Sequence, residues 1–181
     1  MADPSSKGSS NLLIDILHPA APPLPAPLGT EDLRMLAIAR HYAAQSVDPL
    51  NRSGCVIASA GRLLAAACDT FPGSMRSTMA RRRDRAVRSG LLLSAEQAAV
   101  AIAAASGASL RNSSAYIWPA PTDARSAALL VESGCAVITT PGFQIPERLQ
   151  FDMQLIRELA AETGVLFRVV DVTPLSEGPH G

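Results

Sequence analysis

The acid that could take part in chemistry most directly is Glu96, which opens the alanine-rich stretch "SAEQAAVAIAAASG" at residues 94–107. Ser94 is a preferred N-cap residue, and an acid in the first helical turn is favoured by the helix dipole by ~0.3–1 kcal/mol. A carboxylate can also carry protons in a hydrolytic reaction. Residue types alone leave open whether Glu96 is an ordinary first-turn acid or part of a catalytic site.

Other residues that could contact a ligand lie at the ends of predicted strands. Asn51 and Arg52 come just before the first strand, where they could reach a phosphate or lie in an exposed loop. Trp118 ends a later strand and either stacks on a base or covers the core. Both alternatives stay open for each residue.

An arginine-rich stretch, "RSTMARRRDRAVR", spans residues 76–88 and holds six arginines. Arginine suits phosphate binding, but such a run is more often a solvated loop or an interface. The stretch lacks the interleaved aromatic residues that stack on bases, so nucleic-acid binding is not predicted.

Residues suited to metal binding are few and scattered. The cysteines Cys55, Cys68 and Cys135 form no CxxC pair, and an unpaired odd number fits a reducing cytoplasm. The histidines are His18, His41 and His180, and none is close in sequence to residue 94.

The periodicity of the chain predicts alternating strands and helices. Helices are expected at 30–46, with Thr30 as N-cap, and at 94–106, 122–133 and 145–164, the last ended by Gly164. Strands are expected at 53–59, 60–68, 114–119, 135–140 and 165–172, the first two as a hairpin. This order predicts an α/β fold: a three-layer α/β/α sandwich with a five-stranded mixed sheet.

Length and composition set the frame. The 181 residues suit one domain at 30–173, with a disordered, proline-rich arm at 1–29, in which residues 11–18 could form a helical turn or two, and a flexible tail at 174–181. Lys plus Arg and Asp plus Glu both number 16, so net charge favours neither a nucleic-acid binder nor an enzyme for acidic substrates. Prolines interrupt the only apolar run near the start, so no membrane span is predicted and a cytoplasmic protein is expected.

Three stretches carry a resemblance to a known family: "GCVIASAGRLLAAACDTFPGS" (54–74), "SAEQAAVAIAAASGASLRNSSAYIW" (94–118) and "PTDARSAALLVESGCAVIT" (121–139). Together they resemble the cytidine and deoxycytidylate deaminase superfamily over residues 30–172, most closely its deoxycytidylate-deaminase-like branch. The resemblance implies a cytidine-deaminase-like fold. In that family one His and two Cys at helix starts hold zinc, and a Glu two residues after the His shuttles protons.

The resemblance places Glu96 at the proton-shuttle position and keeps Pro121 of the P-C-x-x-C turn. The three metal positions are then occupied by Ser94 in place of His, and by Thr122 and Arg125 in place of the two Cys. Tetrahedral zinc needs three or four N, S or O donors, so no metal cofactor is expected. Asp69 falls where the family's Asn holds a sugar; its alternative is a turn aspartate.

Three interpretations of Glu96 follow. It is a plain first-turn acid, or it pairs with Arg125, whose charge replaces that of the metal, or it is the general acid/base of a metal-free hydrolase. Without a Lewis acid, the third requires several kcal/mol of stabilisation from elsewhere.

The functional expectation is a divergent, zinc-less deaminase homologue, a pseudoenzyme that binds a nucleotide-like small molecule or serves as a structural subunit. The resemblance implies a homo-oligomer, a dimer or higher, or a partner of an active relative. The alternative is a deaminase-type hydrolase that acts on a nucleobase, nucleoside or nucleotide.

Overall fold

The computed structural model describes residues 29–142 and 146–172. In chain order the elements are α2 (Thr30–Ala44), β1 (Gly54–Ser59), β2 (Arg62–Cys68), α3 (Met79–Arg83), α4 (Arg85–Leu91), α5 (Ala95–Ser106), β3 (Ser113–Trp118), α6 (Ala124–Glu132), β4 (Cys135–Pro141), α7 (Glu147–Thr163) and β5 (Leu166–Val170). The expected helical turns at 11–18 lie outside the described residues.

The five strands form one mixed sheet in the order β2-β1-β3-β4-β5. Strand β1 runs antiparallel to both β2 and β3, whereas β3, β4 and β5 are parallel. Gly54, the first residue of β1, therefore pairs with Cys68 and Trp118, the last residues of its two neighbours. The predicted hairpin and five-stranded mixed sheet are confirmed.

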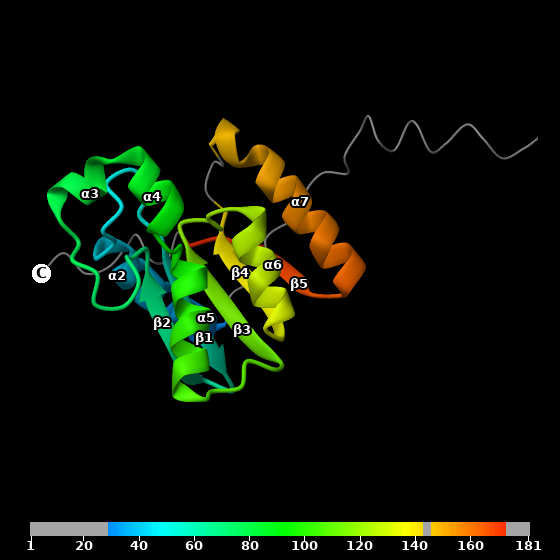
Figure 1. The fold of residues 1–181 in the computed structure, drawn as a ribbon. Coiled ribbons are helices and arrows are strands. Elements are labelled where there is room, and N and C mark those ends of the chain that lie inside the picture. Colours follow the sequence, from blue (N-terminus) through cyan, green and yellow to red (C-terminus); the bar gives the residue numbers. More distant parts are fainter. Residues whose placement is uncertain (1–28, 143–145, 173–181) are drawn as a thin grey trace, which may run out of the picture.

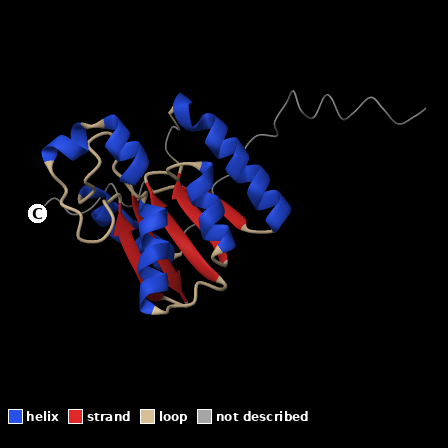
Figure 2. Cartoon of the chain, in the orientation of Figure 1, coloured by secondary structure: helices blue, strands red, loops and turns tan. Residues whose placement is uncertain are grey.

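Helices cover both faces of this sheet (Figures 1 and 2). Helix α2 packs on one face, and α5, α6 and α7 lie on the other. Side chains of a strand alternate between faces, so consecutive residues enter different cores: Val56 and Tyr116 meet α2, while Ile57 and Ile117 meet α5 and its neighbours. The result is the predicted three-layer sandwich.

Small residues allow the layers to approach closely. Gly54 lies against the backbone of α2, and a Cβ atom there would overlap the carbonyl oxygen of Ala39. On the other face, α5 buries an alanine stripe against the sheet. Its members are Ala95, Ala98, Ala99 and Ala103. The alanine-rich composition thus reflects close helix–sheet contact.

Two local predictions are corrected. Gly29, not Thr30, is the N-cap of α2, because the Asp32 side chain accepts from the Gly29 backbone N–H. The arginine-rich stretch is not a loop but forms the short helices α3 and α4, since Thr78 and Asp84 each accept from backbone N–H groups of the following turn. Its role as an interface stays a prediction. Gly164 ends α7 in the left-handed conformation, as predicted.

One end of the sheet gathers the residues that carry chemistry. The carboxyl ends of β2, β3, β4 and β5 meet there with the first residues of β1, α5 and α6. In open α/β sheets this is where ligand sites form. None of the described helices has the length and hydropathy needed to cross a bilayer.

Candidate functional site

Helix α5 begins at a complete capping box. The Ser94 hydroxyl accepts from the Gln97 N–H at 3.2 Å, and the Gln97 side chain accepts from the Ser94 N–H at 3.1 Å. Each group satisfies an N–H that the helix leaves unpaired. Ser94 is therefore the N-cap of this helix, as its residue type indicates.

Glu96, two residues further on, is completely buried. Its Oε1 accepts from the Thr122 backbone N–H at 2.8 Å, and its Oε2 accepts from the Thr122 hydroxyl at 3.0 Å. The carboxyl group thus links the start of α5 to the loop before α6.

Asp69 is a second buried acid at this end of the sheet. Its carboxyl group accepts from the Ser46 hydroxyl (2.6 Å), from the N–H and hydroxyl of Ser53 (2.7 and 2.6 Å) and from the Ala95 N–H (3.2 Å). These bonds join the loop before β1 to the first turn of α5.

Hydroxyl groups connect the two acids. The Ser53 and Thr122 hydroxyl oxygens are 3.2 Å apart, so the polar chain runs Asp69, Ser53, Thr122, Glu96. Nearby, the Ser94 hydroxyl lies 3.0 Å from that of Ser126, in the first turn of α6.

Burial sets the protonation preference of both acids. Removal from water raises the pKa of the Glu96 carboxyl and outweighs the hydrogen bonds from Thr122 and Ser94, which lower it. Burial likewise raises the pKa of Asp69, against the lowering effect of Ser46 and Ser53. The folded chain therefore favours a neutral carboxyl more than water does at both positions.

The predicted ion pair between Glu96 and Arg125 is wrong. Within residues 29–142 and 146–172, Arg125 forms no ion pair, and its side chain is exposed. The residue that faces Ser94 is Ser126, one position later. A sequence signal for this was available: Asp123 is the N-cap of α6, and its side chain accepts from the Ser126 N–H at 2.6 Å, so Ser126 takes the first-turn position that points inward.

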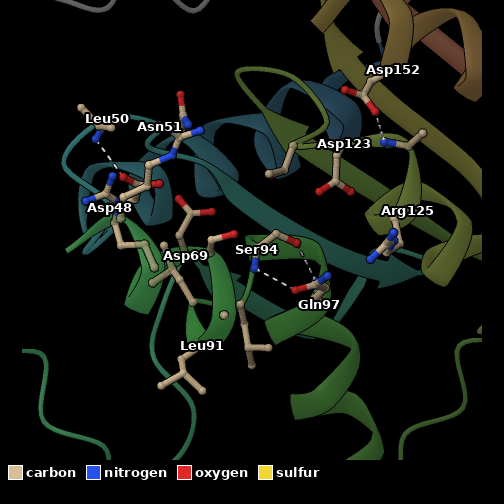
Figure 3. A pocket seen from close by; sticks show the side chains of 18 of the residues that line it. Asp48, Leu50, Asn51, Asp69, Leu91, Ser94, Gln97, Asp123, Arg125 and Asp152 are labelled. Carbon is tan, nitrogen blue, oxygen red and sulfur yellow. Dashed lines mark hydrogen bonds between the residues drawn. The ribbon is translucent and has the colours of Figure 1, made fainter. Parts of the chain in front are cut away.

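A cavity of about 920 Å³, called here the first cavity, opens over these helix starts (Figure 3). Figure 3 shows Asp48 and Asn51 from the loop before β1, Ser94 and Gln97 from α5, and Asp123 and Arg125 from α6 around it. Thr122 lines this cavity, but Glu96 is not among the lining residues. Thr122, which is hydrogen-bonded to both Glu96 oxygens, therefore separates Glu96 from this cavity.

Charges of both signs border the first cavity. Its cations are Arg85 and Arg88 of α4 and Arg125 of α6, and its acids include Asp48, Asp123 and Asp152. Asp152 of α7 accepts from the Ala124 N–H at 3.0 Å, which occupies that carboxylate at the start of α6. Arg85 and Arg125 are exposed, whereas Arg88 is half-buried and its Nη1 donates to the Arg82 carbonyl oxygen at 2.6 Å. A guanidinium group has five N–H donors, so Arg88 keeps donors for an anion.

The donor set at the three helix-start positions does not suit zinc. Of the positions that the resemblance assigns to zinc ligands, Ser94 and Thr122 offer neutral hydroxyls and Arg125 is an exposed cation, whereas zinc sites in proteins use imidazole, thiolate and carboxylate ligands. In the part of the chain that the structure describes, no three His, Cys, Asp or Glu side chains are grouped so that they could hold a metal ion.

The remaining sequence candidates are distributed over three places. Asn51 lines the first cavity and also a second one, and Arg52 lines only the second. Trp118 lines neither: its ring packs on the α2 side of the sheet, with the Arg40 guanidinium 5.5 Å from its centroid. Of its two interpretations, the structure matches the covering of the core.

Comparisons with known proteins show a likeness in fold only. No protein-family model matches the sequence, and no curated protein is similar to it. Among solved structures, the dCMP deaminase from the cyanophage S-TIM5 in complex with dCMP and dUMP superposes with a TM-score of 0.63 at 15% identity, covering 80% of this chain and 100% of that one. Its apo form gives a TM-score of 0.60 at 15% identity, covering 77% and 98%.

A second kind of neighbour is the diaminohydroxyphosphoribosylaminopyrimidine deaminase/5-amino-6-(5-phosphoribosylamino)uracil reductase from Thermotoga maritima. It gives a TM-score of 0.56 at 18% identity, covering 81% of this chain and 38% of that one. The chain has the cytidine-deaminase-like fold, as the resemblance implied.

Proposed function

We propose that this chain is a zinc-independent deaminase-fold protein that binds a nucleotide-like small molecule in the first cavity and does not deaminate it. The observation that carries the proposal is that Thr122 lies between Glu96 and the cavity, with both Glu96 oxygens hydrogen-bonded to it. The fold supplies a ligand site while its buried acid serves the structure.

Size and charge support a nucleotide-like ligand. The volume of about 920 Å³ lies within the range of roughly 300–1,000 Å³ typical of small-molecule sites. Arg85 and Arg88 suit a phosphate, and Asn51 and Gln97 can pair with a sugar or base.

Two features support the absence of hydrolysis. Glu96 is fully buried and would have to exchange Thr122 for a ligand before it could move a proton to one. The hydroxyl donors at the helix starts do not suit the Lewis acid that lowers the pKa of an attacking water. The alternative, a hydrolase with Glu96 as general acid/base, draws support from the raised pKa of this carboxyl.

The test combines ligand binding with turnover. We expect dCMP to raise the thermal midpoint saturably and deoxycytidine, which lacks the phosphate, to do so less. Replacing both Arg85 and Arg88 by Gln should weaken dCMP binding by about tenfold or more, because hydrogen bonds to charged groups contribute roughly 1.5–3 kcal/mol. Arg62→Gln, an exposed arginine that lines neither cavity, is the matched control.

Each part of the proposed function has an experimental outcome that would contradict it. Release of dUMP and ammonia that is lost in Glu96→Gln would establish the hydrolase instead. Stoichiometric zinc in the purified protein would overturn zinc independence, and stabilisation by none of a panel of nucleoside monophosphates would overturn nucleotide binding. Assembly into a homo-oligomer and a cytoplasmic location stay predictions.

A further inference from the structure

The second cavity, of about 250 Å³, adjoins the first one, and Thr122 lines both. It is bordered by the loop before β1, by the ends of β3, β4 and β5, and by the first turns of α7. Its walls are made of Leu50, Asn51, Arg52, Ser53, Pro119, Ala120, Pro121, Thr122, Thr140, Pro141, Pro146, Arg148, Leu149, Met153 and Val169. It shares Leu50, Asn51 and Thr122 with the first cavity.

The composition of this wall differs from that of the first cavity. Most of its residues are apolar, with four prolines among them, and none is acidic. The two ionisable groups are Arg52 and Arg148, so the cavity combines an apolar surface with two positive charges.

Neither guanidinium group has a carboxylate partner within the described ranges, 29–142 and 146–172. Arg148 instead donates to the side-chain oxygen of Asn51 at 2.6 Å, a neutral acceptor that positions the arginine without neutralising it. Both side chains are exposed, and they line the same cavity although they are almost 100 residues apart in the sequence.

We propose that the second cavity binds a small organic anion, with one carboxylate or phosphate monoester group at Arg52 and Arg148 and an apolar body against the prolines. Guanidinium groups pair with both acid types in a two-pronged geometry. An apolar body is favoured because nine of the fifteen lining residues are apolar, Leu149, Met153 and Val169 among them. This site is additional to the nucleotide-like ligand and does not depend on it.

Volume limits the ligand further. At about 250 Å³ the cavity falls just below the usual range for drug-sized molecules, roughly 300–1,000 Å³. A single ring or short branched chain fits this description.

The experiment uses the full chain and three probes that share a ring. Benzoate and phenyl phosphate carry the two possible acid groups, and benzyl alcohol is the neutral control. We expect one or both anions to bind saturably and to shift the backbone amide signals of Arg52, Ala120 and Arg148 in NMR spectra, with benzyl alcohol at least tenfold weaker. The better probe identifies the acid group.

Two sets of variants locate the anion. Arg52→Gln and Arg148→Gln, both at exposed positions that folding tolerates, should each weaken binding by about tenfold. Ala120→Leu should block binding by filling the cavity while both arginines remain. The double variant R85Q/R88Q of the first cavity should bind benzoate or phenyl phosphate as the wild type does.

Any of three results would overturn the proposal. Benzyl alcohol could bind as tightly as the anions, neither anion could bind saturably, or binding could be undiminished in Arg52→Gln, Arg148→Gln and Ala120→Leu. Loss of the anion in R85Q/R88Q alone would place it in the first cavity, which contradicts this inference but leaves nucleotide binding intact. If dCMP failed to bind while benzoate bound normally, nucleotide binding in the first cavity would be contradicted and the anion site in the second cavity would stand.

Discussion

The hydrogen atoms along the polar chain can be counted residue by residue. Each hydroxyl has one proton to donate. If the Ser53 hydroxyl donates to Asp69 and the Thr122 hydroxyl to Glu96, no proton remains for the 3.2 Å contact between those two oxygens. A proton on either carboxyl supplies the missing donor, in keeping with the raised pKa of both acids.

This count predicts the behaviour of Glu96→Gln. A glutamine amide can accept from the Thr122 N–H and donate to the Thr122 hydroxyl, as a protonated glutamate does. Burial raises the pKa of Glu96 in the folded chain, so the protonated carboxyl is the stabilising form. Its contribution to stability is complete below the unfolded pKa, about 4.3, and is lost as the pH rises through the folded pKa. The variant does not titrate there, so its thermal midpoint should exceed that of the wild type by a margin that grows with pH, measured by calorimetry between pH 4 and 8.

The matched control is Glu147→Gln, which removes an exposed first-turn acid of α7. It loses only a small interaction with the helix dipole and should be neutral or slightly destabilising. If Glu96→Gln were instead less stable than the wild type at pH 8, the ionised form of Glu96 would be the preferred one.

At the scale of elements, acids from elsewhere in the chain satisfy the helix starts. Asp69, after β2, accepts from the first N–H of α5, and Asp152, in α7, accepts from the first N–H of α6. Each bond satisfies an N–H that has no partner inside its own helix. The helix starts are thereby tied together at the wall of the first cavity.

Contact between α2 and β1 is equally direct and gives a second prediction. In Gly54→Ala the new Cβ would meet backbone atoms of Ala39 and Ala43, which cannot rotate away as a side chain can. Helix α2 must shift, so we expect destabilisation of about 1–3 kcal/mol, as for other overpacked sites. Chemical denaturation measures the change.

Gly90→Ala is the control for this substitution. Apart from its chain neighbours and the backbone of its own helix, nothing lies within 4 Å of a Cβ placed at Gly90 in α4. Alanine is the better helix former, so the variant should be neutral or slightly stabilised. Equal losses in both variants would show that close approach is not the cause.

At the scale of the whole molecule, one polar cluster joins the first described helix to the last strand. Asp32 of α2 accepts from Arg168 of β5 at 3.0 and 3.3 Å and from the Tyr116 hydroxyl of β3 at 3.0 Å. Burial raises the pKa of Asp32, but the hydrogen bonds from Arg168, Tyr116 and the Gly29 N–H together bring it below its ordinary value. The carboxylate form is therefore the stabilising one.

Acid should weaken this connection. Because the folded pKa of Asp32 is lowered, its contribution is present above the unfolded pKa, about 3.9, and is lost as the pH falls through the folded value. Asp32→Asn should be less stable than the wild type at pH 7, and the gap should narrow towards pH 3. A stability difference between Asp32→Asn and the wild type that stays constant over this range would contradict the role of the charge. The control variant is Asp84→Asn, which changes an exposed helix cap.

Local sequence determined most of the secondary structure. Glycine stops, caps and two-residue or helical periodicity act between neighbours, so the five strands and the helices that cover the sheet were predictable. The N-cap role of Ser94 and the mixed sheet followed from the same signals. The helices α3 and α4 were missed because a run of arginines has no apolar period.

Only the tertiary structure decided which side chains meet. The family resemblance suggested that Glu96 pairs with Arg125, but the N-cap at Asp123 turns Ser126 inward and leaves Arg125 exposed. The sequence alone also did not show that Trp118 lies on the α2 face of the sheet or that Arg52 and Arg148 line one cavity. Hydrogen bonds and charges across long sequence separations depend on how helices pack on the sheet, and that packing is a property of the whole chain.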